Sequence, residues 1–268
     1  ERDGYEVPAE ARIKVDRALA ACLRVPHRSI PARPRAIHWS KELTARLPGM
    51  EAETRVGLDA VVGELRRGED VNQRLTRRHY KAGFNDTLHN DLGVQHLHLG
   101  PRDQGLDKTH AHPMSGAADE LLWVVAREDD VYLLEALGHA AFETFDFAKV
   151  IYDNWPHLLG PPVEGCSADE EDVISAEGRA KLRKIGIWTM VSFNGEVFIP
   201  GGFMNDGTSR DVVHVLCDTL NLTVDMYQWI EANTETVLAK IHECTGLKPT
   251  TLRVVVGDLD MFLRGAVS

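Results

Sequence analysis

Two histidine pairs, each separated by a single residue, are the side chains best suited to chemistry in this chain. His96 and His98 lie in the apolar run GVQHLHLGP, and His110 and His112 lie in the polar run KTHAHP. A neutral imidazole can bind a transition metal or accept a proton near neutral pH. Because side chains alternate along a strand, we expect His96 and His98 on one polar face and Leu97 on the opposite face, toward the core.

A metal site is one interpretation of these pairs. His96, His98, His110 and His112 together would hold a divalent transition metal in a metal-dependent hydrolase, and three nearby carboxylates could join them: Asp103, Asp107 and Asp119. No HExxH or CxxC motif supports the assignment. The plain alternative is that His96 and His98 are partly exposed strand residues that make ordinary hydrogen bonds.

A second interpretation starts from the elements that follow the first histidine pair. The runs ELLWVVARED and DVYLLEALGH flank Asp129-Asp130, a tight-turn signal. This pattern predicts a β-hairpin with strands at 121–127 and 131–137. A histidine and an aromatic residue come just after the second strand: His139 and Phe142.

With the preceding helices and the run VQHLHLG, this order of elements resembles the later strands of small bacterial endoribonuclease toxins of the RelE/ParE superfamily, over about residues 94–142. The resemblance implies a twisted sheet with an RNA-binding cleft and metal-independent attack of a ribose 2′-hydroxyl on the adjacent phosphate. Such a reaction needs a base, a cation and an acid. His96 or His98 would be the base and His139 the acid, and the phosphate would be held by Arg102 or Arg127. The active toxins are small and usually basic, whereas this chain has 268 residues and a net charge of −11.

Charge is distributed unevenly along the chain. Residues 1–100 carry 17 Lys and Arg against 14 Asp and Glu, and the remaining residues carry 13 against 27. A basic cluster in the first part could contact RNA phosphates: Arg66, Arg67, Arg74, Arg77, Arg78 and Lys81. A solvated helix face is the alternative, and the isoelectric point of about 5.5 argues against broad nonspecific binding of nucleic acids.

The hydrophobic periodicity predicts an α+β fold with a helical N-terminal region, a mainly antiparallel sheet, and a C-terminal β-hairpin followed by helices. The expected parts are an N-terminal helix and proline-rich connector at 1–50, an α+β domain with a histidine-lined sheet at 51–159, an acidic linker at 160–178, and a hairpin–helix unit at 179–268.

Several local signals are strong enough to name elements. The pattern at 51–67 is an amphipathic helix closed by Gly68, and Asn194-Gly195 is the strongest hairpin signal in the chain. Residues 210–243 read as helix, either broken near Asn221 or continuous and used for homodimer packing. The other expected elements are helices at 8–23, 71–79 and 141–154, a strand at 37–39, and a last strand in TLRVVVGDL.

The remaining composition narrows the class of protein. The longest apolar runs are too short to cross a bilayer, and the N-terminal residues do not form a signal peptide. Four scattered cysteines without a CxxC pair predict reduced thiols in a cytoplasm: Cys22, Cys166, Cys217 and Cys244.

The sequence leaves three hypotheses for the function: a toxin-like endoribonuclease, a metal-dependent hydrolase, or a non-catalytic interaction module. The last would dimerise through 210–243 and bind an acidic partner, and an inhibitory or regulatory protein is a further possible partner.

Overall fold

The computed structural model describes residues 15–100, 120–169 and 174–246, and it confirms the α+β class. The described helices are α1 (Val15–Arg28), α2 (Lys41–Arg46), α3 (Ala52–Arg67), α4 (Thr87–Leu92), α5 (Ala141–Thr144), α6 (Phe147–Asn154), α7 (Ala176–Lys184), α8 (Arg210–Ala232) and α9 (Thr234–Thr245). The strands are β1 (Ala36–Trp39), β2 (Val94–His98), β3 (Glu120–Ala126), β4 (Asp130–Gly138), β5 (Pro162–Ser167), β6 (Val191–Phe193) and β7 (Glu196–Phe198).

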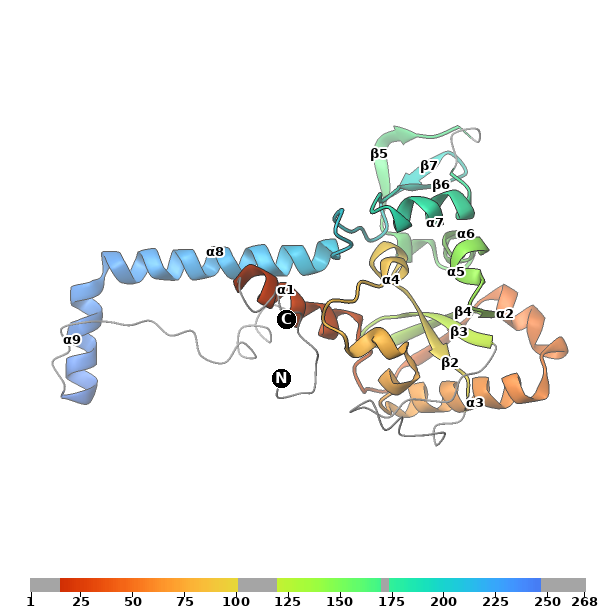
Figure 1. Cartoon of the computed structure of the whole chain (residues 1–268), viewed down its shortest axis with the longest axis horizontal. Helices are drawn as coiled ribbons and strands as arrows, with labels where there is room; N and C mark the ends of the chain where they lie inside the picture. The colour runs from red at the N-terminus through yellow and green to blue at the C-terminus, as the bar shows by residue number, and fades with distance from the viewer. Residues whose placement is uncertain (1–14, 101–119, 170–173, 247–268) are drawn as a thin grey trace. The chain divides into compact units, whose positions relative to one another are not determined.

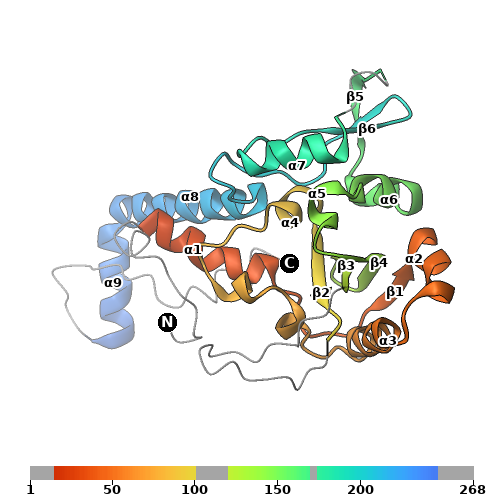
Figure 2. The same ribbon diagram turned by 45° about the vertical axis from the view of Figure 1, so that its right-hand side comes forward.

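A four-stranded sheet with the order β1-β4-β3-β2 forms the centre of the first part of the chain (Figure 2). β3 and β4 are the predicted hairpin, and β2 pairs antiparallel with β3 so that His96 is opposite Trp123. β1 pairs with β4 in parallel, with His38 opposite Tyr132. Strand β2 is therefore an edge strand, and β3 separates it from β4.

Helices cover both faces of this sheet (Figure 1). On one face, Leu58 and Val61 of α3 belong to a buried cluster with Leu122 of β3. On the other face, Phe147 and Ile151 of α6 are buried in a second cluster that includes alternate residues of β3: Leu121, Trp123 and Val125. The sheet is thus apolar on both faces, so the histidine-bearing face is not the polar face expected from the sequence.

Two glycines determine how helix α3 packs against the chain beyond β2 and where the helix ends. Gly57 lies against the backbone of Leu99, where a Cβ atom would stand 2.2 Å from the carbonyl oxygen. Gly68 ends the helix in the left-handed conformation, with φ 74°, as predicted. This close approach sets the position of the chain just beyond β2.

Two N-terminal elements differ from the sequence prediction. Helix α1 continues through Pro26, which we placed in a connector, because Arg28 Nη1 donates a hydrogen bond to Arg24 O at 3.1 Å and holds the last turn. The expected helix at 71–79 is two short 3-10 turns, Asn72–Arg74 and Arg77–Tyr80, because the chain becomes extended at Leu75 between them.

A second, three-stranded sheet has the order β5-β7-β6. Its β6–β7 hairpin turns at Asn194 and Gly195, whose φ angles of 53° and 82° are the positive values that the sequence signal requires. Within the expected linker at 160–178 the structure has a strand, β5, which pairs with β7. Acidic composition there masked a strand whose side chains are mostly exposed.

The chain divides into two compact units, at 1–212 and 213–268. The second unit contains most of α8 together with α9, and the helical run breaks at Asn233 and not near Asn221. The expected strand in TLRVVVGDL lies outside the described residues. None of the helices that the structure describes combines the length and the apolar character of a membrane span.

Candidate functional site

Three histidines from two separate segments meet at one end of the four-stranded sheet. His96 and His98 share a face of β2, as their spacing predicts, and His139 follows directly after β4. β3 brings the two segments together, because Leu121 is opposite His98 on one side and opposite Leu137 on the other. Strand pairing, and not proximity in the sequence, therefore assembles the cluster.

The three imidazoles surround a common point. One potential ligand nitrogen of each ring lies within 4.8 Å of the others. The ring centroids are 5.7 Å apart for His96 and His98, 5.8 Å for His96 and His139, and 5.7 Å for His98 and His139. Zinc holds histidine nitrogens at 2.0–2.1 Å, which places neighbouring ligands about 3.4 Å apart. Of the three side chains, that of His139 is the exposed one.

The environment keeps His96 uncharged. Burial lowers the pKa of His96 from 6.5 to about 4, and the neighbouring rings of His98 and His139 lower it further. A neutral imidazole has a lone pair for a metal or a proton, and it cannot donate a proton as an acid at neutral pH. A neutral His96 can therefore serve as a metal ligand or a base, but not as an acid.

Aromatic residues fix the position of His96. Its ring lies 5.1 Å from the indole of Trp123, which is buried and donates a hydrogen bond from Nε1 to Leu137 O at 3.1 Å. Trp123 also packs against Phe142 and Phe147, with centroids 6.2 Å and 4.7 Å away. The cluster consequently lies at the rim of the apolar core, and sequence reasoning missed the role of Trp123.

The carboxylate nearest in strand register does not reach the cluster. Glu120 is opposite Gly138, next to His139 in the chain, but alternation places it on the other face of β3. It accepts a hydrogen bond from Arg46 Nη2 at 2.9 Å. Among the described residues, the site is therefore built from imidazoles alone.

Arg127 does not lie beside His139, contrary to the expectation that it would hold a phosphate there. It follows the last residue of β3, whereas the three histidines lie where β3 begins. Burial lowers the pKa of Arg127, and its backbone oxygen accepts a hydrogen bond from Arg35 Nε at 2.9 Å. The other expected ligands and cation fall outside the described residues: Arg102, Asp103, Asp107, His110, His112 and Asp119.

The expected RNA-binding cluster is divided by the structure. Arg74 is buried, and its guanidinium donates to both carboxylate oxygens of Glu64 at 2.6 and 2.7 Å and to the carbonyls of His98 and Gly100 at 3.0 Å. It supports the backbone beside the histidines and does not face an external phosphate. The exposed members are Arg66, Arg67, Arg78 and Lys81.

Two of these exposed residues have contacts of their own. Arg67 Nε donates to Glu69 at 2.6 Å, and the Arg78 guanidinium lies 5.9 Å from the ring centroid of Phe84. The side chain of Arg77 lies outside the described part.

A separate histidine pair lies where α1 and α4 meet, and the sequence analysis did not single it out. The rings of His27 and His89 are 5.1 Å apart, and His89 Nε2 is 3.2 Å from His27 O. Burial lowers the pKa of both, that of His27 to about 4. Asp211, at the start of α8, raises the pKa of His27, whereas Arg28 lowers it.

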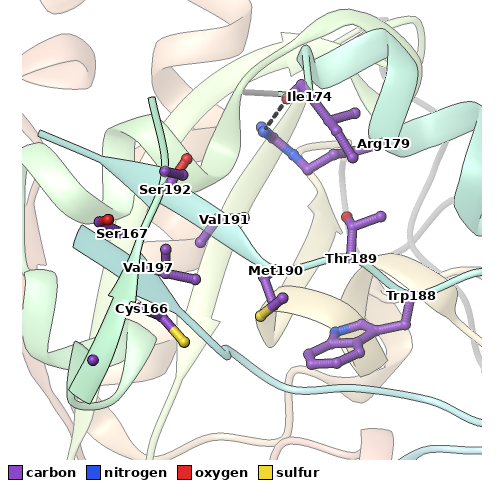
Figure 3. Close-up of a pocket in the computed structure, with 12 residues that line it drawn as sticks. Cys166, Ser167, Ile174, Arg179, Trp188, Thr189, Met190, Val191, Ser192 and Val197 are labelled. Carbon is purple, nitrogen blue, oxygen red and sulfur yellow. Dashed lines mark hydrogen bonds between the residues drawn. The ribbon is translucent and has the colours of Figure 1, made fainter. Parts of the chain in front are cut away.

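A pocket of about 760 Å³ lies beside the three-stranded sheet, and none of the three clustered histidines lines it (Figure 3). Cys166 of β5 and Met190 before β6 lie along it, with Trp188 at one end. Arg179 also lines it, but its guanidinium is bound to Asp146 and to Ile174 O. The pocket therefore offers mainly apolar contacts.

Comparison of the chain with protein-family models, with curated proteins and with solved structures finds no match. The resemblance to RelE/ParE toxins stays a prediction.

Proposed function

We propose that His96, His98 and His139 form a divalent transition-metal centre of a hydrolase. One observation carries the proposal: three imidazole nitrogens from two separate segments lie within 4.8 Å of one another. The lowered pKa of His96 supports it, because metal ligands must be deprotonated. This set differs from the four-histidine set expected from the sequence, since His139 joins the first pair.

Three protein ligands leave a coordination position for water or substrate, the arrangement of catalytic rather than structural zinc sites. A bound ion would supply a Lewis acid and an activated water. The chain's own residues hold the ligands: Trp123 fixes the ring of His96, and exposed His139 leaves one side of the centre open to solvent.

Metal-independent RNA cleavage by the same residues is the second candidate. Neutral His96 suits the base, and exposed His139 at the end of β4 suits the acid. The separation of Arg127 from the cluster leaves this reaction without its expected cation among the described residues. The homodimer through 210–243 and a regulatory protein partner also stay predictions.

Cobalt binding followed by an RNA-cleavage assay tests the proposal. Tetrahedral Co²⁺ absorbs strongly in the visible, so we expect this absorption in the wild-type chain and its loss in His96→Ala and His139→Ala. The matched control, His214→Ala, removes an exposed histidine of α8 and should bind Co²⁺ as the wild type does.

The activity assay separates the two candidates. Hydrolysis that is lost with EDTA and restored by Zn²⁺ supports the metal centre. RNA cleavage that survives EDTA and disappears in His139→Ala assigns acid–base catalysis instead. Unchanged Co²⁺ binding in both alanine variants would falsify the metal proposal.

A further inference from the structure

The helix α8 exposes large apolar side chains in its second half. Five large residues in its second half are between 41% and 61% exposed: Leu222, Val224, Met226, Tyr227 and Trp229. Soluble proteins rarely expose contiguous apolar surface of this kind unless it is a binding surface. Helices of this composition also gain most of their stability from packing.

Acidic residues accompany this apolar surface. Residues 211–239 contain neither Lys nor Arg, and their acidic residues are Asp211, Asp218, Asp225, Glu231 and Glu235. The first three are spaced by seven residues, which is two helical turns. The surface is therefore negative and apolar along its length.

Acidic and apolar side chains alternate on one face of α8. Spacings of four, three and four residues place Asp218, Leu222, Asp225 and Trp229 in a single row. We name this row the α8 stripe. Leu222 and Trp229 offer apolar anchors, and the two carboxylates lie between and beside them.

The charges distinguish between two possible occupants of the stripe. A symmetric dimer pairs a surface with the same surface of a second copy, so it would bring two acidic surfaces together with no Lys or Arg between residues 211 and 239 to compensate them. Like charges on facing helix positions destabilise the contact. A helix with an apolar face flanked by Lys or Arg matches both the anchors and the carboxylates.

We infer that the α8 stripe binds a basic amphipathic helix of a partner protein. Its apolar face packs on Leu222 and Trp229, and its basic side chains pair with Asp218 and Asp225. This interaction does not depend on the histidine cluster, because it uses residues of the second unit alone.

Fluorescence anisotropy with a labelled synthetic peptide tests the inference on the full chain. The probe is a Leu/Lys peptide of about five helical turns, with leucines at three- and four-residue spacing, and its control is a scrambled peptide of the same composition. We expect the amphipathic peptide to bind more tightly than the scrambled one, and its binding to weaken with salt. Trp229 emission should shift to the blue, and the shift should be absent in Trp229→Phe.

Charge variants locate the binding site. The double variant Asp218→Asn/Asp225→Asn should raise Kd about tenfold, which corresponds to about 1.4 kcal/mol. The matched control, Glu53→Gln/Glu177→Gln, removes two exposed acids elsewhere and should leave Kd unchanged. Equal binding of the scrambled peptide, or equal loss in both double variants, overturns the inference. So does a dimer in sedimentation of the chain alone that Leu222→Lys dissociates, because a second copy then covers the stripe.

Discussion

The imidazole of His96 packs against the indole of Trp123, opposite it on β3, with 5.1 Å between the ring centroids and 47° between the ring planes. Trp123 is 1% exposed, so this contact joins the candidate site directly to the apolar core. The position of a potential ligand is thereby linked to core packing.

Replacing Trp123 by Leu should weaken both stability and metal binding. The substitution removes a buried ring and the hydrogen bond to Leu137 O, and we expect a loss of about 3 kcal/mol in the free energy of unfolding. Urea unfolding measures the loss, and a chelator competition with Zn²⁺ measures the affinity. An unchanged free energy of unfolding together with an unchanged affinity for Zn²⁺ would show that Trp123 does not hold His96 in position.

Removing the buried ion pair of Arg74 should lower the free energy of unfolding. It should have no specific effect on nucleic-acid binding. Arg74→Met removes the guanidinium from a buried ion pair with Glu64, and breaking such a pair costs about 3–5 kcal/mol. Arg66→Ala, at an exposed position at the end of α3, should change stability by less than about 0.5 kcal/mol. Thermal unfolding of the two variants makes the comparison, and similar melting temperatures would contradict the structural role of Arg74.

Stability should fall as the pH drops from about 6.5 to about 4. Burial lowers the pKa of His27 and of His96 to about 4, while the unfolded chain protonates its histidines near 6.5. In this window the unfolded state binds more protons than the folded state, so acid favours unfolding by up to about 3 kcal/mol for each ring. Below about pH 4 these two groups add no further loss.

The variant His27→Gln isolates one part of this dependence. It should reduce the difference in unfolding free energy between pH 7 and pH 4, whereas His214→Gln at an exposed position should not. Urea titrations at the two pH values give the difference. An unchanged difference in His27→Gln would mean that His27 is already protonated in the folded protein.

The hairpin between β6 and β7 offers a test of backbone conformation alone. A Cβ atom added at Gly195 meets nothing within 4 Å, so Gly195→Ala is strained only by the φ angle of 82°. We expect a loss of about 1 kcal/mol, measured by urea unfolding. A larger loss would indicate a contact beyond the turn.

The sequence predicts the elements whose signals are local. Asp129-Asp130 and Asn194-Gly195 mark two hairpins, and Gly68 ends α3, because each signal acts within a few residues of its own position. Pairing between distant segments is less predictable. Neither the ion pair of Arg74 nor the pairing of β5 with β7 has a local signature.

The same distinction holds for the candidate site. The shared face of His96 and His98 follows from strand alternation, but their meeting with His139 depends on β3 lying between β2 and β4. Sequence reasoning named His139 as an acid through a resemblance, and it grouped the metal ligands by proximity in the chain. The burial of His27 and His89 depends on the packing of α1 against α4. The alternation of side chains along a strand gives no information about that packing.

Because β2 is an edge strand, a metal ion bound to the three histidines would affect how readily this strand separates from the sheet. No backbone hydrogen bond joins β2 to β4, since β3 lies between them. An ion bound by His96, His98 and His139 would link β2 directly to the residue that follows β4. Detaching the edge strand would then require breaking metal–nitrogen bonds as well as the hydrogen bonds to β3, so amide hydrogens of β2 should exchange more slowly when zinc is bound.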